Sequence, residues 1–245
     1  MNITTIGAFV LLMSLGSARG AYLKLPEGQI PLHSAAGIKL LEECDARANV
    51  FHLLQHLSWQ QTLSACGVAT AVTVLNTMQL ANTPLCESLD SKYPYFDQTN
   101  FFSTGVEKVV SKSTVAKMGF TLAEWAAAVA SYRVKTEAYS CGVGEGEIGF
   151  EAFLARAKNA LKNPAQYLVV NFQRKGLGQV GVGHFCPVGA YHEKTNKFLI
   201  LEVGIFEYPV YWVDAELLWK AMSTRDDVSK KNRGFVVITA QPGNS

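Results

Sequence analysis

One cysteine of this sequence stands where a thiol can act as a nucleophile. Cys66 opens an apolar stretch of helical pattern, and the free amides and the dipole at a helix N-terminus favour a thiolate over a thiol. A neighbouring imidazole would complete the activation by forming an ion pair with the thiolate. Gly67 would let a substrate backbone approach the sulfur. Cys66 is therefore a candidate nucleophile, although a small thiol buried in a core would have the same neighbours in sequence.

His184 is the candidate base for this thiol among five histidines. It follows a glycine-rich approach that ends at Gly183, where the missing side chain leaves room for a ligand beside the ring. A histidine on a strand is also commonly structural, so the assignment depends on its partners. The other histidines are His33, His52 and His56, in the N-terminal part of the chain, and His192, which we expect in solvent at the end of the same strand.

An acid and an amide would complete this site. Glu202 is a carboxylate in the middle of an otherwise apolar run, and a carboxylate buried there needs a partner. Pairing across to the strand of His184 would orient the imidazole, whereas an edge-strand carboxylate would face water. Gln60 and Gln61 precede Cys66, and either could supply the side-chain donor that an oxyanion needs beside the backbone N–H of the nucleophile.

His184 and Cys186 also allow a different function. Residues two apart on a strand point to the same face, so this pair could bind a metal ion. Metal sites usually need three or four ligands, and the sequence contains no Cys-x-x-Cys pair. We therefore assign no metal ligand, and a metal- or thiol-binding protein without turnover stays as the alternative to an enzyme.

The elements expected around these residues change character along the chain. An extended arm at 23–37 precedes helical patterns, and the later part consists of short β-branched or aromatic runs separated by turns. Thr121 and Glu124 have capping-box spacing. We predict an α+β fold in which a helical lobe packs against an antiparallel sheet lobe. Helices are expected at 38–57, 66–80 and 121–133, and consecutive antiparallel strands at 166–173, 184–192, 197–206 and 234–240.

Composition and the N-terminus limit the class of protein. The chain has 245 residues, 49% of them hydrophobic, and a net charge of +2 without a basic stripe, which argues against a nucleic-acid binder. Residues 1–20 have the pattern of a secretory signal peptide, with a buried N-terminal helix as the alternative. We expect export, to a periplasm, of a catalytic domain at 21–245. No later stretch is long and apolar enough for stable membrane insertion.

Five cysteines could form disulfides in an oxidising compartment. If Cys66 is reactive, the other four either form up to two disulfides or stay free and buried. The five are Cys44, Cys66, Cys86, Cys141 and Cys186.

Several segments together resemble the phytochelatin synthase family, especially its short bacterial members, from about Leu25 to the C-terminus. The resemblance implies a papain-like cysteine proteinase fold. The matching segments are CGVATAVTVLNTM, VVNFQRKGLGQ, GHFCPVGAYHEKTNKFLILEV, EYPVYWV and LWKAMSTRDDVSKKNRGFVVI.

The resemblance implies an enzyme that attacks the Cys–Gly amide of glutathione, releases glycine and holds a γ-glutamylcysteinyl thioester on Cys66. His184 matches the catalytic histidine, and the oxyanion glutamine falls on Gln60 rather than Gln61. By resemblance to short members, the acyl group passes mainly to water and less to a second glutathione. No resident cofactor is expected, and cadmium or zinc would enter as a metal–thiolate complex of the substrate. A homodimer is left open, and a general papain-like peptidase is a further alternative.

Two positions depart from the family pattern. Glu202 stands where the family has Asp, and Ile205 stands where it usually has Arg. A longer acid could still orient the imidazole, so we expect a working enzyme, with a pseudoenzyme as the alternative. Arg174 and Arg233 fall on basic positions of the family pattern, where a guanidinium could bind substrate carboxylates, unless each is a solvated turn residue.

Overall fold

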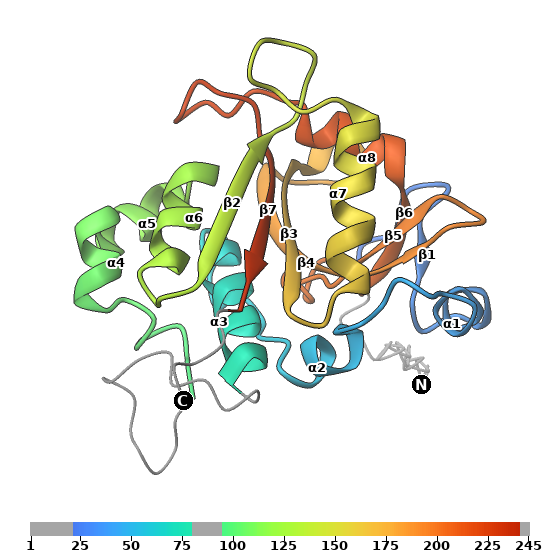
Figure 1. Ribbon diagram of the computed structural model, residues 1–245, viewed down its shortest axis with the longest axis horizontal. Coiled ribbons are helices and arrows are strands. Elements are labelled where there is room, and N and C mark those ends of the chain that lie inside the picture. The colour runs from blue at the N-terminus through green and yellow to red at the C-terminus, as the bar shows by residue number, and fades with distance from the viewer. Residues whose placement is uncertain (1–21, 80–94, 241–245) are drawn as a thin grey trace, which may run out of the picture.

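A seven-stranded antiparallel sheet organises the part of the chain that the structure describes. The structure is a computed structural model, and it describes residues 22–79 and 95–240 (Figure 1). The expected signal peptide and Cys86 lie outside these residues. In the described part, the strand order is β1-β6-β5-β4-β3-β7-β2, and every neighbouring pair is antiparallel. The strands are β1 (Ile30–Pro31), β2 (Lys135–Ser140), β3 (Gln166–Gln173), β4 (Gly183–His192), β5 (Lys197–Ile200), β6 (Tyr211–Asp214) and β7 (Gly234–Thr239).

Helices cover both faces of this sheet. In Figure 1, α7 lies to the right of β3 and α3 passes behind β7, while α4, α5 and α6 gather beside β2. Among the described residues, no helix is both long and apolar enough to cross a bilayer. The helices are α1 (Ala35–Glu42), α2 (Val50–Gln55), α3 (Cys66–Gln79), α4 (Thr104–Val109), α5 (Lys112–Met118), α6 (Leu122–Ala130), α7 (Phe150–Lys162) and α8 (Ala215–Met222), with a 3-10 turn η1 (Arg174–Leu177).

Helix α3 is buried on all sides, as its composition predicts. Its apolar side chains pack in the core, and two hydrogen bonds fix its first turns. The Thr70 hydroxyl donates to the Phe185 carbonyl on β4 at 3.0 Å, and the indole of Trp125 on α6 donates to the Gly67 carbonyl at 2.8 Å. The N-terminus of α3 is therefore held against the strand that carries His184.

The α+β class is confirmed, and several elements agree with the sequence prediction. Helix α3 and strands β3, β4 and β7 lie where they were expected. The capping box of α6 is present, with the Thr121 side chain accepting from the Glu124 backbone and the Glu124 carboxylate accepting from the Thr121 N–H. Helices and strands are less segregated than expected, because α7 and α8 come late and pack on the sheet.

Three expected elements differ from the prediction. The helix expected at 38–57 is two helices, since Ala46 between them bridges to Tyr191 of β4. The strand expected at 197–206 ends at Ile200, so that Glu202 lies in the segment after β5. Strand β7, expected as the last of four consecutive strands, does not pair with β5 but lies between β3 and β2. Helical periodicity and turn signals are local, whereas these pairings join segments far apart in sequence.

Candidate active site

The Cys66 thiol lies at the first residue of α3, at the edge of the core. Only 6% of the residue is exposed, and it lines a cavity of about 190 Å³. The amides of the first helical turn have no partner within the helix, so the backbone around the sulfur favours negative charge. Both conditions suit a thiol that must ionise and still meet a ligand.

His184 and Glu202 form a buried pair beside this thiol. The Nε2 atom of His184 lies 2.7 Å from Oε1 of Glu202, and the two residues are 3% and 0% exposed. Oε1 also accepts a hydrogen bond from the Gly204 backbone at 2.6 Å. Because Nε2 is committed to Glu202, Nδ1 is left to exchange a proton with Cys66. The structure thus brings together the nucleophile, base and acid that the sequence suggested.

The electrostatics of the three groups favour an ion pair. Burial works toward a higher pKa of Cys66, but the hydrogen bond and charge of His184, with backbone hydrogen bonds from Phe185 and Gly67, bring that pKa below 9.0. Burial works toward a lower pKa of His184, but the charge of Glu202 raises it well above 6.5. A lowered thiol pKa beside a raised imidazole pKa favours the thiolate–imidazolium pair over the two neutral groups.

Glu202 stays ionised despite complete burial. Burial alone would raise the pKa of this carboxyl, but His184, Arg174 and the Gly204 amide lower it from 4.5 to about 2. A carboxylate that is charged at all ordinary pH values can accept a hydrogen bond from the Nε2–H group of His184 and stabilise the imidazolium.

Arg174 lies elsewhere than the sequence prediction placed it. It was expected to bind substrate, yet it is 2% exposed, and its Nη2 atom lies 3.0 Å from Oε1 of Glu202 and 3.1 Å from Oε2 of Glu207. Its Nη1 donates to Gln179 at 2.9 Å. The guanidinium of Arg174 is therefore bound by protein groups, and it stabilises the carboxylate of Glu202 instead of contacting a ligand.

Arg233 and Gly183 both line the cavity that holds Cys66. The guanidinium is anchored by the Arg225 carbonyl at 2.6 Å and by Asp226 at 3.2 Å. A Cβ atom at Gly183 would lie 2.9 Å from Nη2 of Arg233, so glycine there makes room for the guanidinium. The cavity thus combines a thiol, a cation and nearby acids.

Gln60 and Gln61 lie in different surroundings. Gln60 is buried, its backbone N–H donates to the Val203 carbonyl at 2.9 Å, and its side-chain Oε1 has no hydrogen-bond partner among the described residues. Gln61 is exposed. Gln60 is therefore tied to the segment that carries Glu202, as a positioned amide must be, whereas Gln61 is a surface residue.

Comparison with known proteins places the chain in a family. The model of the family described as phytochelatin synthase matches residues 21–235. The chain belongs to the phytochelatin synthase family. It is similar to the glutathione gamma-glutamylcysteinyltransferase of Schizosaccharomyces pombe, with 28% identity over 92% of this chain and 53% of that protein.

Plant relatives match over the same region. The glutathione gamma-glutamylcysteinyltransferase 3 of Lotus japonicus is 28% identical over 87% of this chain and 41% of its own length. The glutathione gamma-glutamylcysteinyltransferase 1 of Arabidopsis thaliana is 25% identical over 86% and 41%. The chain therefore spans about half the length, or less, of the curated relatives it matches.

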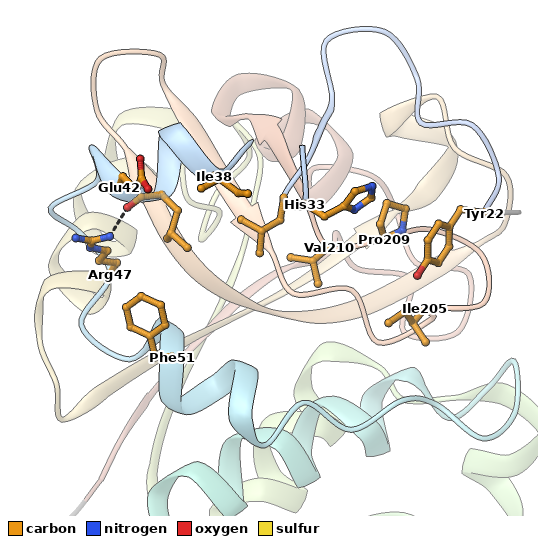
Figure 2. Close-up of a pocket in the computed structure, with 11 residues that line it drawn as sticks. Tyr22, His33, Ile38, Glu42, Arg47, Phe51, Ile205, Pro209 and Val210 are labelled. Carbon is orange, nitrogen blue, oxygen red and sulfur yellow. Dashed lines mark hydrogen bonds between the residues drawn. The ribbon is translucent and has the colours of Figure 1, made fainter. Parts of the chain in front are cut away.

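The departure from the phytochelatin synthase pattern at Ile205 does not leave the acid without a cation. Ile205 lines an apolar cavity of about 550 Å³, where Figure 2 shows it near Tyr22 and Pro209 with Phe51 at the far end. Arg174 supplies the guanidinium next to Glu202. The substitution therefore changes the wall of a separate cavity and not the charge balance of the site.

Gly67 has a different role from the expected one. A Cβ atom there would lie 2.8 Å from the Phe120 ring and 3.1 Å from the Trp125 ring. Glycine is needed because two aromatic side chains pack on the first turn of α3, so its backbone faces the core and not a substrate. The expectation that His192 is solvated was wrong as well, since it is 2% exposed and its Nδ1 contacts Thr195.

The remaining described cysteines are free and buried, which agrees with the alternative that they form no disulfides. They are Cys44, Cys141 and Cys186. Cys186 lies next to the His184–Glu202 pair, and the charge of Glu202 adds to burial in raising the pKa of the Cys186 thiol.

Some site residues were not identified from the sequence. Asn171 and Asp226 line the cavity with Cys66, and the Gly204 amide donates to Glu202. Asn171 carried a usable signal, being a polar side chain in the middle of a β-branched run. Asp226 and Gly204 stand in turn-like segments where such residues are common, so local pattern does not single them out.

We predict that Cys66 is alkylated by iodoacetamide faster at pH 7 than Cys44, Cys141 and Cys186. His184→Gln removes the group that lowers the pKa of Cys66 while burial persists, so the midpoint of the pH–rate profile should move upward. Peptide mass mapping after timed alkylation measures both. His192→Gln, which removes another buried imidazole, should leave the profile unchanged. An unshifted midpoint in His184→Gln would contradict the ion pair.

We predict that Arg174→Met lowers the free energy of unfolding by about 3–5 kcal/mol, because it removes the guanidinium partner of the buried Glu202 carboxylate. Glu202 stabilises the fold above pH 4.5, and this contribution is lost as pH falls toward about 2. Without Arg174 the folded-state pKa of Glu202 rises, so this acid-dependent loss becomes smaller. Urea unfolding across this pH range measures both effects, and the exposed Arg156→Met is the control. Equal stabilities of the two variants would argue against a supporting role for Arg174.

Proposed function

We propose that this protein is a thiol enzyme that cleaves the Cys–Gly amide of glutathione. The observation that carries the proposal is the Cys66–His184–Glu202 arrangement beside a cavity that contains Arg233. Membership of the phytochelatin synthase family and the names of the relatives supply the substrate.

The first half-reaction follows from the ion pair. The Cys66 thiolate attacks the carbonyl carbon of the cysteinyl residue and forms a tetrahedral intermediate. The backbone N–H of Cys66 and the amide of Gln60 are the proposed donors to its oxyanion. As the C–N bond breaks, the imidazolium of His184 gives its proton to the amine of glycine, which leaves. The product on the enzyme is a γ-glutamylcysteinyl thioester.

The second half-reaction regenerates the thiolate. Neutral His184 takes a proton from the acceptor, which attacks the thioester carbonyl and displaces Cys66. With water as acceptor the product is γ-glutamylcysteine, and with a second glutathione it is a longer (γ-Glu-Cys)n-Gly peptide. We propose water as the main acceptor. Cadmium or zinc would take part as a metal–thiolate complex of the substrate, and no resident cofactor is required.

The cavity has charges that complement glutathione. Glutathione carries two carboxylates and one ammonium group. Arg233 can offer free N–H groups to a carboxylate in a bidentate manner, and Asp226 and Asp227 line the same cavity, where they can attract the ammonium group. Asn171 adds an uncharged donor and acceptor.

We also propose a papain-like arrangement for the chain. It is supported by a nucleophile at the N-terminus of a buried helix and an imidazole on an antiparallel strand, with the acid following the next strand. Export, as inferred from residues 1–20, and a catalytic domain at 21–245 belong to the same proposal. A general peptidase would have the same arrangement of site residues. The substrate that is cleaved therefore distinguishes a peptidase from the proposed glutathione-cleaving enzyme.

Incubation with glutathione, followed by mass spectrometry of the products, tests the activity. We expect equal amounts of glycine and γ-glutamylcysteine, abolished by Cys66→Ser and retained by Cys141→Ser. No glycine release, or release that persists in Cys66→Ser, would refute the mechanism. Longer products on addition of cadmium would overturn the preference for water, and efficient cleavage of ordinary α-linked peptides would favour a peptidase.

We predict that Glu202→Asp lowers kcat for glycine release by about 10- to 100-fold, because the carboxylate retreats by one C–C bond while its partners stay in place. Glu207→Asp, which shortens the other acid on Arg174, is the matched control and should have a small effect. A higher kcat in Glu202→Asp would show instead that the longer acid impairs the reaction.

A further inference from the structure

Together with Cys186, the buried pair of His184 and Glu202 forms a cluster of three potential metal ligands. One donor atom each of His184, Cys186 and Glu202 lies within 4.8 Å of the others, and all three residues are buried. Imidazole nitrogen, thiolate sulfur and carboxylate oxygen are the ligands of zinc and related soft divalent cations. Glu202 thus provides the third ligand that the spacing of His184 and Cys186 alone lacked.

A second observation points to a missing ligand at the same place. All the hydrogen bonds of Glu202 converge on Oε1, from His184 at 2.7 Å, Gly204 at 2.6 Å and Arg174 at 3.0 Å. Its Oε2 atom is fully buried and has no hydrogen-bond partner among the described residues. Buried acceptors are nearly always satisfied. Oε2 can therefore bind a cation while Oε1 keeps Arg174 and Gly204.

The charges around the cluster decide when a cation can bind. The guanidinium of Arg174 lies 3.0 Å from Nε2 of His184 and opposes a cation there. Glu202, Glu207 and a Cys186 thiolate would together carry three negative charges, which balance Arg174 and a divalent ion. With a neutral side chain at position 186 the buried cluster would keep an unbalanced positive charge, which is costly. The thiolate is therefore essential.

The size of the cluster suits such an ion after a small closure. Zinc–ligand bonds of about 2.0–2.3 Å place tetrahedral ligands about 3.3–3.8 Å apart. The widest separation in the cluster is no more than 4.8 Å. Side-chain rotations that move the ligand atoms by about 1 Å would close the site around an ion.

We infer that Zn²⁺ or Cd²⁺ binds to His184, Cys186 and Glu202 in the substrate-free protein and inhibits it. Binding forms three metal–ligand bonds and releases the thiol proton of Cys186 and the proton of the His184 imidazolium. The Cys66 thiolate then loses its imidazolium partner. Binding stands on the cluster alone, whereas inhibition rests on the function proposed above. This ion differs from the metal–thiolate form of the substrate, because the protein supplies all three ligands.

Binding is tested without glutathione, in the full chain carrying Cys66→Ala so that the nucleophile cannot ligate. Titration with Cd²⁺ should give one equivalent of a cadmium–thiolate ultraviolet band and release of protons into a weakly buffered indicator. Adding Cys186→Ser should abolish the band, whereas adding Cys141→Ser or Cys86→Ser should retain it. No band, or a band that survives Cys186→Ser, overturns the site. Thermal unfolding checks that each variant folds.

Inhibition is tested through the reactivity of Cys66 in the protein with its native nucleophile. Pre-loading with Cd²⁺ should slow alkylation of Cys66 at pH 7 by roughly tenfold, because the thiolate fraction falls when the imidazolium is lost. The same treatment of Cys186→Ser should have no effect. Stoichiometric binding without slower alkylation would overturn inhibition and leave the metal site standing. Failure of glutathione cleavage without metal would refute the proposed function, and the titration would be unaffected.

Discussion

The ionised carboxylate of Glu202 in a fully buried position is the constraint on which the rest of the site depends. An isolated charge at that depth is costly, and here it is balanced by His184, Arg174 and the Gly204 amide, all on one oxygen. The same contacts that make burial tolerable also hold the imidazole. The stability of the core and the chemistry of Cys66 therefore share one interaction.

The fold follows from the need to bring these groups to one oxygen. Strand β5 ends before Glu202, and the chain turns at Gly204, where a Cβ atom would lie 3.0 Å from both the guanidinium and the carboxylate. The turn η1 after β3 carries Arg174, and β4 carries His184. The antiparallel order β5-β4-β3 places the three segments side by side. The three side chains meet through this pairing of strands, which a single helix could not provide.

Much of this could be predicted from the sequence, and the exceptions have a physical cause. The period of apolar residues and the capping residues are local, so α3, α6, β3 and β4 were predictable, as were the chemical types of Cys66 and His184. The role of Arg174 was not, because an arginine after a strand looks the same whether it meets a substrate or a buried acid. The break at Ala46 and the place of β7 depend on pairings distant in sequence.

The two thiols beside His184 show how surroundings decide reactivity. Both interact with the same imidazole, and burial works toward a higher pKa in both. Cys66 lies at a helix N-terminus, with backbone hydrogen bonds from Phe185 and Gly67, and its pKa falls. Cys186 lies near the carboxylate of Glu202, whose negative charge keeps its pKa high. One imidazole can thus serve a single nucleophile, because the acid that orients the ring also keeps the second thiol protonated.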